Sequence, residues 1–367
     1  MTASPYFIVI LLILVGFYVL DLVANLLNLK ALDSKLPDEF SDTFDVQKYS
    51  DSQRYTRTTT LFGLVESTLM LVALLAFWWL KGFQHADAIA RSFDQGPIVT
   101  GLICLSILMA ANSLLSLPFE IYDTFVIEKK FGFNKTTFGT FVGDRLKGLA
   151  LMLLLGLPLT AIILYFFENT GPLGWLYGWL IVSGFSLLLA YLVPQYILPL
   201  FNKFSPMEDG DLKQEIYKMS EKAGFPLREI SIMDGSKRST KSNAFFTGFG
   251  KNKKIALFDT LIENHTVPEL VSVLAHEIGH FKKKHILFQM VFGILQTGLL
   301  FFLVGLFLNN ADLFKAFGVE QTSVYLSLVF FGFLFQPVSR ILAIVSAIFS
   351  RKFEFQADAY AAEVTGQ

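Results

Sequence analysis

The residues best suited to carry out chemistry lie in one short stretch, Val271–His280, which reads VSVLAHEIGH. It contains His276, Glu277 and His280 in the order His-Glu-x-x-His, a pattern that predicts a metal site on a helix. Residues four apart share one face of a helix, so the two imidazoles can bind one metal ion. Glu277 then lies about 100° around the helix, where it can accept a proton from a water that the metal activates.

A catalytic zinc of this kind needs a third protein ligand and one open coordination position. Cys104 is the only cysteine, which excludes an internal disulfide and a multi-cysteine metal site, and it falls in the middle of an apolar stretch elsewhere. His285 comes five residues after His280 and would be turned away from it on a continuous helix. We therefore expect His285 to be a solvated or interfacial residue.

Glu354, in the stretch RKFEFQAD, is the remaining candidate for the third ligand. Asp358 lies four residues later on the same helical face and could accept a hydrogen bond from the ring N–H of a ligand histidine. The alternative for Glu354 is a juxtamembrane acid that balances Arg351 and Lys352. A His-Glu-x-x-His helix that needs one more acid favours the ligand.

The composition assigns these residues to a membrane protein. Hydrophobic residues make up 53% of the 367 residues, and only 17% are charged, against about 25% in an ordinary soluble domain. Such a chain cannot cover its apolar surface with polar side chains in water. The composition excludes disorder, a nucleic-acid-binding arm and a simple soluble enzyme, and it predicts the lipid bilayer as a partner and no nucleic acid.

Seven stretches are long and apolar enough to cross about 30 Å of hydrocarbon as helices. They are 6–29, 61–83, 97–118, 149–167, 174–201, 286–309 and 323–350. The first has no small-residue cleavage site, so we expect it to be retained as a span.

The positive charges alternate between low and high counts in the successive segments that join these stretches, and 14 of the 30 Lys and Arg residues lie in 202–285. Because cytoplasmic loops carry the excess of Lys and Arg, the N-terminus is predicted outside and the segment 202–285 in the cytoplasm. Compact loops favour a bacterial inner membrane, with the endoplasmic reticulum membrane as the alternative.

The expected fold class is mainly α, a polytopic membrane protein with seven transmembrane helices and a small α/β zinc-protease domain. The protease segment should contain a helix over 211–223, a strand at 230–233, a hairpin of 243–249 and 254–258 around Gly250–Lys253, and a second helix from Thr266 or Pro268. The predicted division is 1–201 for the first five spans, 202–285 for the protease segment, 286–350 for the last two spans and 351–367 for a juxtamembrane helix.

Several motifs resemble one known family. The run HEIGHFKKKH and the run RKFEFQADAYA at the end of a late span are similar to the integral-membrane CAAX prenyl protease (type 1) family of gluzincin-type zinc metalloproteases. The segments SNAFFTGFG, beginning at Ser242, and KIALFDTL, beginning at Lys254, resemble the same family, as does the layout of seven spans.

The resemblance implies that His276, His280 and Glu354 bind one zinc ion per chain and that Glu277 is the general base. It also implies that the helices enclose an intramembrane chamber with the zinc site at its cytoplasmic side. The family removes the C-terminal tripeptide from proteins prenylated at a CAAX cysteine, so the implied partner is such a peptide or protein substrate.

Asn243 and Ala244 are candidates for substrate binding. An extended segment beside the metal helix can pair its free edge with a substrate strand, and the Asn243 amide can bond a substrate backbone group. From the residues alone, an asparagine that only ends a hairpin strand explains Asn243 equally well. The resemblance favours substrate binding.

One feature of the family falls outside the sequence. The family carries a His and an Arg well downstream of the third ligand, thought to steady the oxyanion, whereas Gln367 is only thirteen residues after Glu354. We expect either a further C-terminal segment or another group to do this work. His265 is a weak substitute and is better explained as a surface residue near a helix N-terminus.

Two other functions remain open beside a zinc metalloendopeptidase. A membrane quality-control protease of the HtpX kind would need no prenyl group, but that kind has fewer spans and a shorter chain. A transporter with a structural or degenerate HExxH should show inverted repeats and broken helices. Pro158, Pro194 and Pro337 interrupt spans, but the sequence contains no matching halves.

Overall fold

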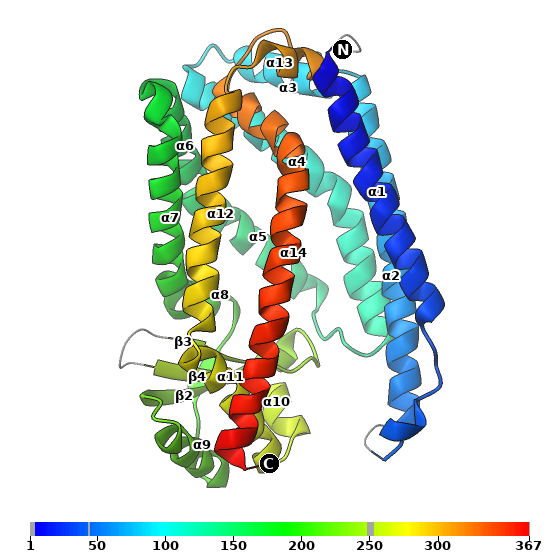
Figure 1. The fold of residues 1–367 in the computed structure, drawn as a ribbon, viewed down its shortest axis with the longest axis vertical. Coiled ribbons are helices and arrows are strands. Elements are labelled where there is room, and N and C mark those ends of the chain that lie inside the picture. The colour runs from blue at the N-terminus through cyan, green and yellow to red at the C-terminus, as the bar shows by residue number, and fades with distance from the viewer. Residues whose placement is uncertain (1–3, 43–44, 248–252, 367) are drawn as a thin grey trace. The chain divides into compact units, whose positions relative to one another are not determined.

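Long helices dominate the computed structural model, which describes residues 4–42, 45–247 and 253–366 (Figure 1). Within these residues, seven helical runs are long and apolar enough to cross a membrane, which confirms the predicted number. They are α1 (Pro5–Ala31), α2 (Val46–Trp79), α4 (Pro97–Tyr122) continued to Glu128, α5 (Phe138–Leu151) continued by α6 (Leu157–Asn169), α7 (Gly174–Leu192) continued by α8 (Leu198–Phe201), α12 (His285–Phe307) and α14 (Val324–Thr365).

Two prolines that interrupt the predicted spans are accommodated inside the helical runs. A π-helical turn covers Val193–Ile197 and includes Pro194, and another covers Met152–Gly156, just before Pro158. Proline lacks the N–H that would close the ordinary helical hydrogen bond, and single π-helical turns of this kind occur inside longer helices. These runs therefore continue past their prolines.

The chain forms two compact units. The first contains Met1–Gly132, Leu157–Trp175 and Phe302–Val338. In it, the short helices α3 (Gly82–Arg91) and α13 (Ala311–Phe317) lie between membrane helices. The indole N–H of Trp78, near the end of α2, donates to the carbonyl oxygen of Ala316 in α13 at 3.0 Å. This bond ties α2 to α13.

The second unit contains Phe133–Gly156, Leu176–Phe301 and Ser339–Gln367, and it carries the protease segment. A four-stranded sheet has the order β1-β2-β4-β3, in which β2 and β4 are parallel and the other pairs antiparallel. The strands are β1 (Phe204–Pro206), β2 (Leu227–Met233), β3 (Ala244–Thr247) and β4 (Lys253–Phe258), and the helices beside them are α9 (Asp211–Lys222), α10 (Asp259–Asn264) and α11 (Val267–Lys282) (Figure 1).

The hydrophobic core of the second unit lies between one face of this sheet and its helices. Ile230, Ile255 and Leu257 point from the strands into the same cluster as Leu274 and Ile278 of α11. Alternate residues of a strand face opposite sides, so the apolar positions of β2 and β4 come together on the helical side. The helix α11 is therefore held by its apolar face, which leaves its histidines on another face.

The sequence predicts the local elements of this unit more completely than their pairing. The two strands of the expected hairpin are antiparallel neighbours, β3 and β4, while residues 248–252, which include most of the predicted turn, lie outside the described residues. The strand β1 and the parallel pairing of β2 with β4 were not predicted, because both depend on partners that are distant along the chain.

The start of α11 is set by a capping box. The backbone N–H of Thr266 and its hydroxyl both donate to Glu269, at 2.7 and 2.8 Å. Pro268 is tolerated in the first turn, where its missing N–H would have no helical acceptor. The helix therefore begins where the sequence predicts, at Val267, nine residues before His276.

We expect Leu274→Ala to lower the free energy of unfolding by about 2–5 kcal/mol, because the deleted side chain leaves a cavity in the core under α11. Leu274 is completely buried, whereas Leu287 on α12 is half exposed. The measurement is the thermal unfolding of the full-length protein in detergent, with Leu287→Ala as the matched control. Equal losses of stability in the two variants would contradict this account of the core.

Candidate metal centre

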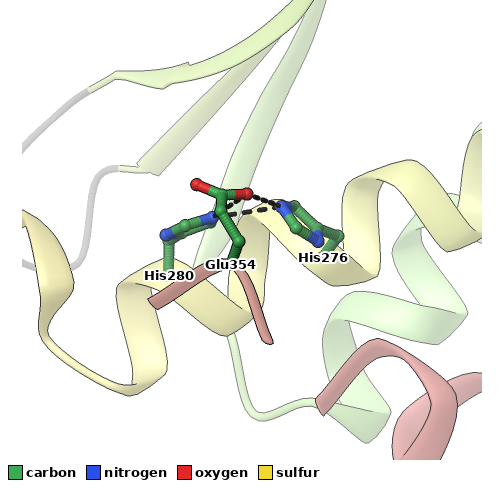
Figure 2. Close-up of side chains that lie close together, drawn as sticks. All are labelled: His276, His280 and Glu354. Atoms are coloured by element: carbon green, nitrogen blue, oxygen red, sulfur yellow. Dashed lines mark hydrogen bonds and ion pairs between the residues drawn. The ribbon is translucent and has the colours of Figure 1, made fainter. Parts of the chain in front are cut away.

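Three side chains from two helices converge on one point. Figure 2 shows His276 and His280 on α11 and Glu354 on α14 pointing toward one another. The Nε2 atoms of the two histidines are 3.1 Å apart, and Glu354 Oε2 lies 3.3 Å from that of His276 and 3.7 Å from that of His280. The cluster therefore consists of residues from two parts of the sequence that are far apart.

The chemistry of this donor set fits a zinc ion. Two imidazole nitrogens and one carboxylate oxygen lie within 4.8 Å of one another, and this combination is a known ligand set of catalytic zinc. The side chain of Glu354 is 55% exposed, so the cluster is accessible from one side. The three residues can hold a metal and still leave a position for water or substrate.

Asp358 contacts His276 on the side of the ring that faces away from the cluster. Its Oδ1 lies 2.8 Å from Nδ1 of His276, the ring nitrogen that does not face the cluster. Asp358 and Glu354 are four residues apart on α14, so one face of this helix presents both carboxylates to the same imidazole. This arrangement directs Nε2 of His276 at the candidate metal position.

The expectation for His285 is wrong, because the side chain is only 2% exposed. The helix α11 ends at Lys282, and Lys284 has a positive φ of 59°, so the chain turns before α12 begins at His285. This turn brings Nδ1 of His285 to 3.1 Å from Nδ1 of His280. On one continuous helix His285 would point away from His280, and no Gly or Pro in the sequence marks the break.

Close packing of α11 on α14 positions Glu354. A Cβ atom added at Gly279 would lie 3.0 Å from the Cα of Ala357 and 3.1 Å from its carbonyl oxygen. Ala357 is itself completely buried, and Tyr360, one turn further on, packs against the core of the protease segment. The missing side chain of Gly279 therefore allows the backbones to approach closely enough for Glu354 to reach the histidines.

Glu277 lies between the two histidines in sequence and, like them, is partly buried. Burial raises the pKa of its carboxyl group, and the carboxylate of Glu354 raises it further, while His276 acts in the opposite direction. Burial also lowers the pKa of His280, which favours the neutral imidazole that a metal requires. A carboxylate with a raised pKa is suited to accept a proton near neutral pH.

The candidate substrate residues lie at the edge of the sheet. Ala244 begins β3, which is the last strand in the sheet order and packs beside α11. The side chain of Ala244 is buried in the core. Asn243 is exposed, and its side-chain oxygen accepts a hydrogen bond from the N–H of Ala244 at 2.8 Å. Ala244 can therefore contact a ligand only through its backbone.

The two faces of β3 have different surroundings. Ala244 and Phe246 belong to or pack against the core, whereas Phe245 and Thr247 line a cavity of about 920 Å³ on the other side of the sheet. A strand added to the edge of β3 would send alternate side chains to the two sides. The cavity does not include the metal cluster.

Cys104, which the sequence excludes as a ligand, and His265 are not part of the cluster. Cys104 is buried in α4, in the first unit. His265 is exposed, and its Nδ1 lies 3.0 Å from the carbonyl oxygen of Leu261. The surface location expected for His265 is confirmed.

The seven long helices and the cluster of two histidines and a glutamate define a membrane protein with a metallopeptidase-like centre, and comparison with known proteins identifies its family. Residues 25–203 match the family described as CAAX prenyl protease N-terminal, five membrane helices, and residues 206–367 match peptidase family M48. Together these matches cover most of the chain.

Relatives and a solved structure agree with these matches. The chain is 35% identical over 369 residues to CAAX prenyl protease 1 homolog of Oryza sativa subsp. japonica, covering 98% of this chain and 87% of that protein. It is 33% identical over 360 residues to CAAX prenyl protease 1 of Saccharomyces cerevisiae, covering 90% and 79%. The crystal structure of S. mikatae Ste24p has a TM-score of 0.93 at 30% identity, covering 98% of this chain and 89% of that chain.

The chain therefore belongs to the CAAX prenyl protease 1 group of peptidase family M48 and is an integral-membrane metalloprotease. The fold class and the reaction class predicted from the sequence are both confirmed. The comparisons lend no support to the transporter or to the quality-control protease.

We expect Gly279→Ala to weaken metal binding and to lower the free energy of unfolding by about 1–3 kcal/mol, because α14 must move away from α11. Metal affinity would be measured by competition with a chelator, beside thermal unfolding. Gly293→Ala is the matched control, since a Cβ at this position of α12 would meet nothing within 4 Å. If Gly279→Ala bound metal as tightly as Gly293→Ala, close packing would not be what positions Glu354.

Proposed function

We propose that the protein is a zinc endopeptidase that removes the C-terminal tripeptide from proteins prenylated at a CAAX cysteine. The observation that carries this proposal is the convergence of His276, His280 and Glu354, with Glu277 beside them, in a chain of this family. The substrate class rests on the names of the relatives, which are CAAX prenyl proteases.

In this proposal, His276, His280 and Glu354 hold one zinc ion per chain. At this site, a bound zinc ion would supply polarisation of the scissile carbonyl group and a lower pKa for a coordinated water. Asp358 accepts a hydrogen bond from Nδ1–H of His276 and so keeps Nε2 of that ring free to bind the metal.

Glu277 acts as the general base. Its carboxylate accepts a proton from the water that attacks the scissile carbonyl carbon, and it then passes the proton to the leaving amide nitrogen, so that the peptide bond breaks. Burial suits this task, because it raises the proton affinity of the carboxylate.

The substrate would bind as an added strand on β3. Main-chain hydrogen bonds to the edge at Ala244 hold an extended peptide in register whatever its sequence, and the Asn243 amide bonds a substrate backbone group. Since β3 packs beside α11, a peptide on this edge can present its scissile bond to the metal.

The orientation and the division of the chain belong to the same proposal. The alternation of Lys and Arg places the N-terminus outside and the protease segment in the cytoplasm. Residues 1–201 then form the first five spans, 202–285 the protease segment, 286–350 the last two spans and 351–367 the juxtamembrane helical segment that carries Glu354. The compact loops favour a bacterial inner membrane, and the endoplasmic reticulum membrane is the alternative.

We expect the purified protein to contain one zinc ion and to cleave a farnesylated CAAX peptide, and Glu277→Gln to retain the zinc but lose about 10²–10⁴-fold in kcat/KM. The amide cannot accept the proton, yet it keeps the size of the side chain. Zinc content and product formation would be measured on the same samples.

The same peptide without its farnesyl group is the control for substrate class. Equal cleavage of both peptides would overturn the prenyl requirement and leave the peptidase intact. Zinc binding without any Glu277-dependent cleavage would overturn the enzymatic role of this site.

A further inference from the structure

Among the described residues, the second histidine of the motif has a buried histidine at its Nδ1 atom, where the first has a carboxylate. His280 and His276 turn their Nε2 atoms toward the cluster, so each ring must carry its proton on Nδ1 when Nε2 binds a metal. Asp358 accepts the hydrogen bond that Nδ1–H of His276 then donates. The Nδ1 atom of His280 instead lies 3.1 Å from Nδ1 of His285.

Two facing ring nitrogens form a hydrogen bond only if one of them carries a proton and the other a lone pair. When Nδ1 of His280 donates, Nδ1 of His285 must accept, and the proton of His285 is then on Nε2. That atom lies 2.9 Å from Oε1 of Gln356, an oxygen that can only accept. The amide oxygen of Gln356 thus selects the tautomer of His285, and His285 selects that of His280.

The packing around His285 fixes the plane of its ring. Its imidazole stacks on Phe353 of α14 with 4.1 Å between the ring centroids and 12° between the planes. Phe288, one turn along α12, packs edge-on against the same phenyl ring at 5.3 Å. Because His285 is almost fully buried, water does not compete for either ring nitrogen.

We propose that His285 and Gln356 are positioning residues that hold His280 in its metal-binding tautomer and orientation. They act through His280 and do not touch the metal position. This inference rests on the proposed function only in taking His280 as a metal ligand, and it requires neither a peptide nor a prenyl substrate.

The test compares the zinc affinity of the full-length protein in detergent, by competition with a chelator, for native chain, His285→Phe and His285→Asn. His285→Phe keeps a ring that can stack on Phe353 but has no acceptor, so we expect zinc affinity to fall about 10–100-fold. His285→Asn places its side-chain oxygen near the position of Nδ1, so we expect it to restore affinity to within about threefold of the native chain.

A purely structural role for His285 predicts the reverse order, because phenylalanine preserves the buried volume and asparagine leaves a gap. The proposal is overturned if His285→Asn binds zinc no better than His285→Phe, or if His285→Phe binds it as tightly as the native chain. Thermal unfolding without metal would be recorded for each variant, so that loss of fold is distinguished from loss of affinity.

Gln356 provides the second pair of variants if His285→Phe does not fold. Gln356→Met removes the final acceptor and should weaken zinc binding, whereas Gln356→Glu keeps an acceptor and should not. Equal affinities of these two variants would contradict the proposal. Failure of the native protein to cleave any peptide would overturn the proposed function, yet it would not change the order of zinc affinities.

Discussion

The contact between α11 and α14 at Gly279 is the constraint on which the site depends. Glu354 is 74 residues away from His280 in sequence, so only the packing of the two helices can bring their side chains together. The backbone of Ala357 occupies the space that a Cβ of residue 279 would fill. The same turns of α14 that pack on the glycine carry Glu354 and Asp358, so one helical face both packs and presents the acids.

The core of the second unit extends this constraint to the rest of the protease segment. Apolar residues of α11 are buried against the sheet, and the end of α14 packs against the same cluster through Tyr360 and Val364. The side chain of Lys222 donates to the backbone oxygen of Val364, which adds a polar link from α9. Both helices that carry the candidate ligands are therefore fixed to one core, which limits their relative movement.

The sequence predicts features that depend on local patterns, and it misses features that depend on a change of direction. Seven apolar stretches and the strands of the hairpin follow from length, composition and alternation, and the structure contains them. The burial of His285 could not be predicted, because a single left-handed residue, Lys284, ends the helix without any residue type that favours this conformation. The parallel pairing of β2 and β4 was missed for a related reason, since a non-local contact leaves no periodicity in either strand.

The unequal support of the two histidines has an electrostatic reason. Three carboxylates already lie close to the cluster, those of Glu277, Glu354 and Asp358. Glu354 raises the pKa of Glu277 in addition to the effect of burial, because like charges disfavour ionisation. A fourth carboxylate behind His280 would act on the pKa of Glu277 in the same direction as Glu354. The His285 imidazole and the Gln356 amide, which lie behind His280, add no carboxylate to the cluster.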